Sequence, residues 1–425
     1  MNGPALDTGA AVVARRAGDF EVMSLVGFAH GTSHFFHLVI PSLFPWLMAE
    51  FGLSFTRAGT LTTAFFIVSG VGQALAGFAV DRYGAQRVLS AGIALLTLSA
   101  LTLSAANGYP TLLAAAVLAG AGNAVFHPAD FTVLNRSVSP ARLAHAFSAH
   151  GVAGNIGWAA APVCMAGIAA ASSWRIAALA AASLGIVALG CVVLLRGSLA
   201  APVSTHSSVA PAGAPAASSP FAFLRVGAVW MCFVFFFASM MGLSGLQNFA
   251  PPVLNHVYGL PLTAAASALT VFLLGGAMGI AAGGFLAARF EAHERVVAVL
   301  LVSAALLALA LATGSVPHAA VTPVMAVFGF FTGTATPSRD LLVRRAAMDR
   351  FGQRSFGRIY GFVYSGLDTG LSVAPVLLGP LMDRGMFSTV LYAVALFQGL
   401  AVLAALRVGH ARMETVAELQ TEARS

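Results

Sequence analysis

The sequence predicts an all-α membrane protein in which twelve transmembrane helices form two pseudo-symmetric six-helix bundles. Three observations support this fold class: the scarcity of charge, the recurrence of long apolar stretches, and an internal repeat. Hydrophobic residues make up 58% of the 425 residues and charged residues only 9%, whereas about a quarter of the residues in a soluble domain are charged. A chain with so little charge cannot cover a surface that faces water, so lipid must solvate much of it.

The first bundle is predicted from six apolar stretches, each close to the roughly 20 residues that cross the hydrocarbon core. Short segments that hold Pro, Gly or charge separate these stretches and set the boundaries between helices. The predicted helices lie near residues 22–49, 58–80, 88–106, 110–135, 143–170 and 174–195.

The second bundle follows from six further stretches of the same kind. These lie near residues 226–256, 264–288, 296–314, 319–344, 356–381 and 387–407. Between the bundles, a segment rich in Ala, Pro and Ser has no charge and no helical periodicity, which predicts a flexible linker. The predicted organisation is therefore a cytoplasmic tail (1–21), a bundle (22–196), a cytoplasmic linker (197–222), a second bundle (223–408) and a second cytoplasmic tail (409–425).

An internal repeat supports the division into two bundles. Residues 51–84 align with residues 258–291 without a gap. The matched pairs are Gly52/Gly259, Thr56/Thr263, Phe65/Phe272, Gly72/Gly279, Gly77/Gly284, Phe78/Phe285 and Arg82/Arg289. Repeated halves are common in transporters, and their substrate site lies near the bilayer midplane between the repeats.

The arginines predict the orientation of the chain. The sequence contains 22 Lys and Arg residues, and all are Arg. On the predicted topology nearly all of them fall on one side; only Arg57, Arg175 and Arg384 fall on the other, and Arg339 lies within a helix. This bias places both termini and the linker in the cytoplasm of a bacterial inner membrane. The net charge of +7 is thus explained by topology, and nucleic acid is not an expected partner.

A charged loop follows the second predicted helix. Its sequence is Gly-Phe-Ala-Val-Asp-Arg-Tyr-Gly-Ala-Gln-Arg, and the residues that carry the pattern are Gly77, Asp81, Arg82, Gly84 and Arg87. This loop resembles the signature of the major facilitator superfamily, although Ala85 and Gln86 stand where basic residues are usual. The resemblance implies secondary transport by alternating access, with the loop acting as a charged gate.

Three further motifs narrow the resemblance. Ser33-His34, Phe126-His127-Pro128 and Gly154-Asn155 are similar to segments of the fosmidomycin-resistance branch of that superfamily. This similarity implies efflux of a drug-like or metabolite compound. One departure is that His37-Leu38 stands where the branch has an Asn-Asp pair.

Polar residues inside the predicted helices are the candidate site, because buried ionisable groups are costly in a bilayer and face a cavity or a partner. We expect substrate contacts from His30, His34, His37, Asn123, His127, Gln247, Asn248 and Arg339. Proton coupling is expected from Asp368, Asp130, Asp340 and His150, with Asp368 as the leading candidate. The expected partners are a small molecule, protons and the lipid bilayer, with no cofactor, and the protein is expected to be a monomer.

Two alternatives follow from the same residues. Arg339 and the histidines favour uptake of an organic anion. The spacing of His30, His34 and His37 along one helical face would also suit a metal ion, which would favour a membrane-embedded metalloenzyme. That enzyme would need further His or carboxylate ligands at the same depth, and no second cluster of this kind is evident along the chain. No nucleotide-binding loop or nucleophile–base pair is present, so we expect a transporter rather than an enzyme or an ATP-driven pump.

Overall fold

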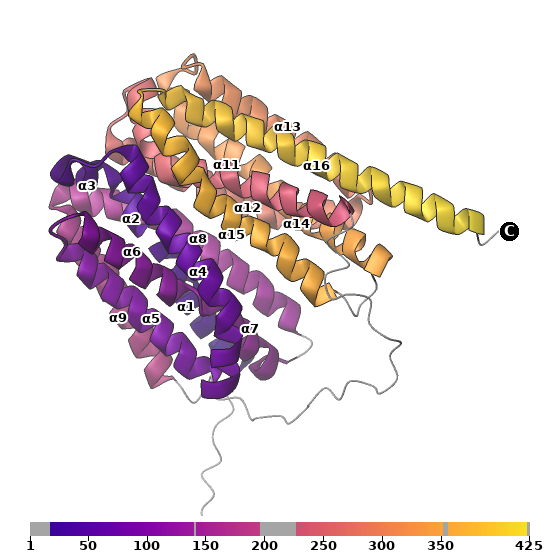
Figure 1. Cartoon of the computed structure of the whole chain (residues 1–425), viewed down its shortest axis with the longest axis horizontal. Helices are drawn as coiled ribbons and strands as arrows, with labels where there is room; N and C mark the ends of the chain where they lie inside the picture. Colours follow the sequence, from indigo (N-terminus) through magenta and orange to yellow (C-terminus); the bar gives the residue numbers. More distant parts are fainter. Residues whose placement is uncertain (1–17, 140–141, 196–226, 352–355, 423–425) are drawn as a thin grey trace, which may run out of the picture.

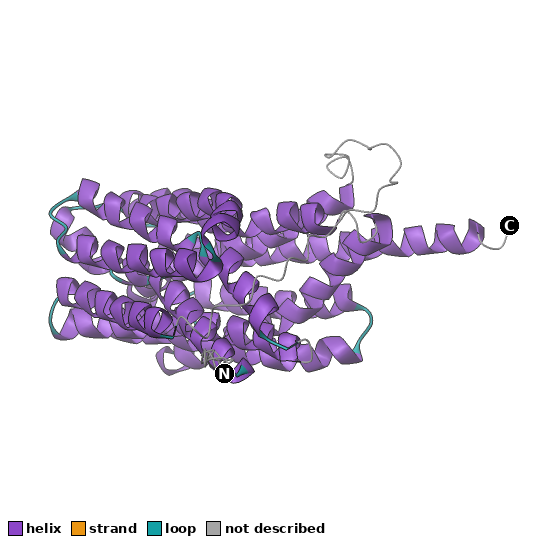
Figure 2. Ribbon diagram, turned by 90° about the horizontal axis from the view of Figure 1, so that it is seen from below, coloured by secondary structure: helices purple, strands orange, loops and turns teal. Residues whose placement is uncertain are grey.

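The computed structural model describes residues 18–139, 142–195, 227–351 and 356–422. Within these ranges every regular element is a helix (Figure 2). The helices form two bundles that follow one another in the chain, the first in indigo to magenta and the second in orange to yellow (Figure 1). The predicted all-α class with two helical bundles is confirmed.

The first bundle runs from Asp19 to Leu194. Its helices are α1 (Asp19–His37), α2 (Val39–Ser42), α3 (Phe44–Phe51), α4 (Phe55–Tyr83), α5 (Ala85–Ser104), α6 (Tyr109–Asn123), α7 (Phe126–Ser137), α8 (Leu143–Ala171) and α9 (Trp174–Leu194).

The second bundle runs from Gly227 to Glu422. Its helices are α11 (Gly227–Tyr258), α12 (Leu262–Arg289), α13 (His293–Ala312), the short 3₁₀ helix η3 (His318–Ala320), α14 (Val321–Phe351), α15 (Phe356–Asp383) and α16 (Phe387–Glu422). The last helix continues well past its predicted end at 407 and projects beyond the bundle in Figure 1.

Ten helical segments of the described residues are long and apolar enough to cross a membrane. The two other predicted spans, 22–49 and 356–381, correspond to the segmented run α1–α3 and to α15. The twelve predicted spans therefore all coincide with helical segments, and two of these segments fall outside the ten that length and composition select.

Prolines explain why the first and fourth spans are broken. A proline has no N–H and its ring clashes with the carbonyl four residues earlier, so it fits best in the first turn of a helix. Other helices of this protein, α8, α11, α14 and α15, nevertheless keep prolines in their interiors. Pro41 and Pro128 are the third residues of α2 and α7, and the chain breaks just before these helices, at Leu38 and at Ala124–Val125. The breaks place His37 and Asn123 at helix ends in the middle of the bundle.

The two bundles meet at one end of the molecule. We call this end the far face; it carries Gly52, Gly259 and Gly385, which have left-handed backbone angles that favour glycine. The opposite end, where the described chain stops at 195 and resumes at 227, is the linker face (Figure 1). Near the far face α4 packs against α15, and α8 packs against α12.

Hydrogen bonds join the bundles in the half of the molecule nearest the far face. Thr63 donates to the backbone carbonyl of Ser372 at 2.6 Å, and Thr270 donates to the carbonyl of Ala159 at 2.8 Å. At Gly59, an added Cβ would lie 2.7 Å from the carbonyl oxygen of Pro375. The absence of a side chain there permits this close approach of α4 to α15.

Glycines also set the spacing of α12 and α14 within the second bundle. A Cβ at Gly329 would lie 1.8 Å from the carbonyl oxygen of Phe272, and one at Gly279 would lie 2.2 Å from that of Phe330. The backbones of the two helices therefore touch directly, as small-residue faces allow in membranes.

Candidate functional site

A cavity of about 430 Å³ lies between the two bundles. Its lining comes from α1, α4, α6, α7 and α8 of the first bundle and from α11, α12, α13, α14, α15 and α16 of the second. The titratable groups of the first-bundle lining are imidazoles, whereas the second bundle contributes a guanidinium and two carboxylates.

Five histidines gather on the first-bundle wall. They are His30, His34 and His37 of α1, His127 of α7 and His150 of α8, and all line the cavity. The spacing of four and three residues along α1 places its three rings on one helical face, as predicted. The rings of His30 and His34 have centroids 4.3 Å apart, and those of His30 and His127 are 5.3 Å apart. The expectation that no further ligands would share the depth of the α1 histidines was therefore wrong, because the fold brings α7 and α8 alongside.

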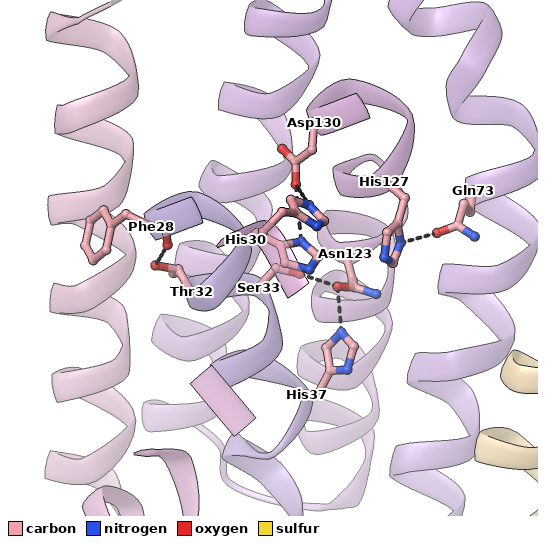
Figure 3. Close-up of polar contacts among 10 residues, drawn as sticks. Phe28, His30, Thr32, Ser33, His37, Gln73, Asn123, His127 and Asp130 are labelled. Carbon is pink, nitrogen blue, oxygen red and sulfur yellow. Dashed lines mark hydrogen bonds and ion pairs between the residues drawn. The ribbon is translucent and has the colours of Figure 1, made fainter. Parts of the chain in front are cut away.

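Asp130 lies behind this wall and is fully buried. Its Oδ2 accepts a hydrogen bond from Nε2 of His150 at 3.0 Å and lies 3.2 Å from Nδ1 of His30 (Figure 3). Asp130 does not line the cavity, so it contacts the histidines rather than the space where a substrate would sit.

Asn123 holds a second group of side chains. Its Oδ1 accepts hydrogen bonds from the hydroxyl of Ser33 and from Nε2 of His37, the latter at 2.8 Å (Figure 3). Trp158 donates its indole N–H to Nδ1 of His37 at 3.1 Å. These two contacts assign the proton of His37 to Nε2 and leave the ring neutral, since an acceptor nitrogen carries no hydrogen. Both ring nitrogens of His37 are thus already bonded to protein groups.

His127 is oriented by Gln73 of α4. Its Nδ1 lies 2.9 Å from Oε1 of Gln73 (Figure 3). An amide oxygen can only accept, so Nδ1 of His127 carries the proton and Nε2 keeps its lone pair.

The second-bundle wall carries the charged groups. Nε of Arg339 donates to Oδ1 of Asp340 at 2.9 Å, and the guanidinium lies 4.7 Å above the ring of Phe236. Asp368 of α15 also lines the cavity. Its side chain makes no hydrogen bond or ion pair with any described residue, which distinguishes it from Asp340.

Two predicted substrate contacts lie elsewhere. Gln247 and Asn248 of α11 are almost completely buried and do not line the cavity. Asn248 accepts a hydrogen bond from Thr62 of α4 at 2.7 Å, so it joins the bundles where they are closed. The sequence predicted that these two residues contact the substrate, because polar side chains inside a helix face either a cavity or a protein partner; here Asn248 faces a protein partner.

The predicted gating loop lies at the linker face between α4 and α5. Asp81, Arg82 and Arg87 are exposed, and Asp81 makes no hydrogen bond or ion pair with a described residue. Gly84 has φ +87°, the left-handed backbone that lets the chain turn sharply. Gly77 has no neighbour near its Cβ position. Among the described residues, Asp81 of the predicted gating loop therefore makes no charged contact with another part of the protein.

Three carboxylates outside the membrane-spanning segments stabilise the ends of the bundles. The hydroxyl and backbone amide of Ser139 lower the pKa of Asp19 at the linker face. The guanidinium of Arg175 and the indole of Trp174 lower the pKa of Glu50 at the far face. Partial burial acts to raise the pKa of Asp383, but hydrogen bonds from Thr56 and the backbone of Phe55 outweigh it, and the pKa lies below its ordinary value.

Sequence reasoning missed Gln73 and Trp158, although each had a usable signal. Gln73 is a lone amide in an apolar stretch, and Trp158 lies four residues after Gly154 on the same face of α8. The ring of Trp158 stacks on His34 with centroids 4.4 Å apart.

Comparisons with known proteins agree with this arrangement. The sequence profile of the Major Facilitator Superfamily matches residues 23–347. The chain is 28% identical to the uncharacterized MFS-type transporter YfnC of Bacillus subtilis, over 91% of this chain and 92% of that protein. It is 33% identical to the fosmidomycin resistance protein of Escherichia coli over 36% of this chain and 37% of that protein. It is 24% identical to the hexuronate transporter of B. subtilis over 86% of this chain and 87% of that protein.

Solved structures share the fold. A bacterial homologue of the human lysosomal transporter Spinster, in an inward-facing and unoccupied conformation, aligns with a TM-score of 0.71 at 15% identity, covering 93% of this chain and 98% of that chain. A point mutant of the nucleoside transporter NupG aligns with a TM-score of 0.71 at 14% identity, covering 92% of this chain and 98% of that chain.

Proposed function

Because the chain belongs to the Major Facilitator Superfamily and is therefore a secondary transporter rather than an enzyme, we propose that it exports a drug-like or metabolite molecule in exchange for protons. The observation that carries this proposal is the cavity of about 430 Å³ between the bundles, with titratable groups on both of its walls. The bundles touch near the far face, so alternating access would require this contact to open as the linker face closes.

The arginine bias supports placing the linker face in the cytoplasm. In that orientation the cavity is closed toward the periplasm by the packing of α4 on α15 and of α8 on α12. A molecule that reaches the cavity from the cytoplasm would then meet the histidine wall.

Proton coupling is assigned to Asp368. A carboxylate in a cavity wall with no ion-pair partner among the described residues can bind a proton without breaking an existing contact. Asp340 is already paired with Arg339. Asp130 lies behind the cavity wall, where its carboxylate already accepts a hydrogen bond from His150. These contacts make Asp340, Asp130 and His150 weaker candidates than the sequence alone indicates.

Efflux is favoured over uptake by the match to the fosmidomycin resistance protein. Uptake of an organic anion is the second candidate, and one observation supports it: Arg339 places a guanidinium in the cavity wall. The full-length similarity to a hexuronate transporter is consistent with that alternative.

Proteoliposomes loaded with a pH-sensitive dye test both candidates. Fosmidomycin and glucuronate are added in turn, with and without an imposed pH gradient, and proton flux and probe uptake are recorded together. We expect proton movement with fosmidomycin for the wild-type protein and none for Asp368→Asn, which should still exchange labelled probe for unlabelled probe. Asp340→Asn is the matched control, because it removes a second carboxylate from the same wall.

Full coupling in Asp368→Asn would overturn the assignment of the proton site. Proton flux with glucuronate and none with fosmidomycin would favour uptake of an organic anion. Loss of exchange as well as coupling in Asp368→Asn would show that the carboxylate binds the probe itself.

A further inference from the structure

We propose that His30, His34 and His127 form a binding site for one divalent transition-metal ion, of the Zn²⁺, Co²⁺ and Ni²⁺ class, in the first-bundle wall of the cavity. One ring nitrogen from each of the three histidines lies within 4.8 Å of the other two. The inference does not depend on the direction of transport or on the driving ion, since binding alone tests it.

Two of the ring nitrogens face a space left open by a glycine. An ideal Cβ at Gly154 of α8 would lie 2.7 Å from Nδ1 of His34 and 3.0 Å from Nε2 of His30. Any side chain at this position would therefore fill the space between the two nitrogens. Nδ1 of His34 is buried and makes no hydrogen bond with a described residue. A buried nitrogen without a partner is costly, and a metal ion would satisfy it.

One hydrogen bond and one ion-pair contact indicate which nitrogens of His127 and His30 can bind metal. Gln73 holds the proton of His127 on Nδ1, so Nε2 is the free lone pair. Asp130 lies 3.2 Å from Nδ1 of His30 and favours a proton there, which leaves Nε2 of His30 as the ligand atom. Metal-binding histidines usually donate their other N–H to a carboxylate or a carbonyl group in this way.

A second combination, His30 with Asp130 and His150, is also compact, but its geometry is unsuitable. The rings of His30 and His150 stack with centroids 3.5 Å apart and planes inclined by 24°. Imidazole lone pairs lie in the plane of the ring, so two nearly parallel rings cannot direct them at one ion. The rings of His30 and His127 are inclined by 66°, which allows their lone pairs to converge.

The ligand set defines the class of ion. Three neutral imidazoles suit Zn²⁺, Co²⁺, Ni²⁺ and Cu²⁺, whereas Mg²⁺ and Ca²⁺ require oxygen ligands. A site with three protein ligands keeps a fourth position open. Since all three histidines line the cavity, that open position would face whatever molecule occupies it.

The test uses full-length protein in detergent, purified through a tag without histidine and stripped of metal with EDTA. Isothermal titration with Zn²⁺ at neutral pH should give one ion per chain, and Mg²⁺ should give no binding. His34→Gln, His127→Gln and Gly154→Ala should each weaken Zn²⁺ binding by about tenfold or more, and Gln73→Leu should weaken it by about 10- to 100-fold as an outer-shell partner. His256→Gln, an exposed histidine of the second bundle, is the control and should bind like the wild type.

Optical spectra of Co²⁺ give a readout that does not depend on the variants folding well. A nitrogen-rich site with four ligands should give the intense visible bands of tetrahedral Co²⁺ with the wild-type protein. The inference would be overturned if the wild-type protein did not bind Zn²⁺ stoichiometrically. The same conclusion would follow if folded His34→Gln and His127→Gln bound Zn²⁺ as tightly as the wild type.

Discussion

The carboxylate of Asp383 at the end of α15 caps the first turn of α4, where it accepts a hydrogen bond from the backbone amide of Thr56 at 3.0 Å. The hydroxyl of Thr56 and the amide of Phe55 donate to the same carboxylate. A negative charge at a helix N-terminus is stabilised by the helix dipole and by the free amides of the first turn. This contact joins the two bundles, so it stabilises the conformation that is closed at the far face.

Removal of this cap should favour opening of the far face. Asp383→Ala should cost the closed state about 1 kcal/mol, as loss of a helix N-cap does, and should raise the ratio of open to closed molecules about fivefold. Spin labels at Asn107 and Thr313, one in an exposed far-face loop of each bundle, report the separation by pulsed EPR. Glu50→Gln, a far-face carboxylate that binds Arg175 within one bundle, should leave the distance distribution unchanged.

The same contact should respond to acid. A carboxyl group whose pKa is lower in the closed state stabilises that state fully above its ordinary pKa, about 4, and the stabilisation is lost as the pH falls through the lowered value. The open fraction of the doubly labelled wild-type protein should therefore be constant from pH 7 to about 5 and rise below pH 4. Asp383→Asn cannot titrate, so a similar rise in that variant would assign the acid response to another group.

The gating loop should be needed for transport but not for folding. Asp81 is exposed and has no hydrogen-bond or ion-pair partner among the described residues, so Asp81→Asn should leave thermal unfolding unchanged. It should slow transport of the probe in proteoliposomes severalfold, because closure of the linker face would lose a charge. Glu291→Gln is the comparison, because Glu291 aligns with Gly84 in the second repeat. Wild-type transport by Asp81→Asn would show that the loop does not act as a gate in this protein.

The close approach of α8 to α1 should make the stability of the protein sensitive to any side chain at Gly157. A Cβ at Gly157 would lie 2.0 Å from the carbonyl oxygen of Gly31, and overpacking of this kind costs about 1–3 kcal/mol or more. Gly157→Ala should therefore lower the apparent unfolding temperature clearly. Gly167 lies on the same helix with nothing near its Cβ position, so Gly167→Ala should be neutral or slightly stabilising. Equal melting of the two variants would contradict the packing.

The orientation of the chain is tested by labelling in intact cells. In a background without cysteine, a cysteine at Asn107 in a far-face loop should react with an impermeant thiol reagent. One at Ser208, which lies outside the described residues, should be protected because the linker is predicted to be cytoplasmic. Labelling at Ser208 would reverse the proposed topology and, with it, the direction in which the cavity opens.

The existence of the helices was predictable because hydrophobic length is a strong signal in a membrane protein. The breaks within the helices were harder to predict. Pro41 and Pro128 lie in the first turns of new helices, but the sequence placed each of them inside a continuous span. The sequence alone also suggested the face of His30, His34 and His37, since one helix fixes their spacing.

Contacts between helices were not predictable from this sequence alone. His127 and Asp130 on α7, and His150 on α8, reach the α1 histidines only through the packing of three helices. Conversely, Asn248 resembled a cavity residue but lies at the contact between bundles. Periodicity indicates which residues share a face of one helix, whereas the partner of that face depends on tertiary packing.

The direct backbone contact of α12 with α14 has a consequence for the range of molecules that the cavity can hold. Two helices whose carbonyls rest against glycines cannot slide or rotate past each other without collision. We therefore expect α12 and α14 to move together as one rigid unit. The width of the cavity can then change only through the tilt of one bundle against the other. The bulk of the molecule that fits would then depend on the contact of α4 with α15. Substitutions in the far-face part of this contact, for example at Gly59, would therefore alter the size selectivity of the transporter.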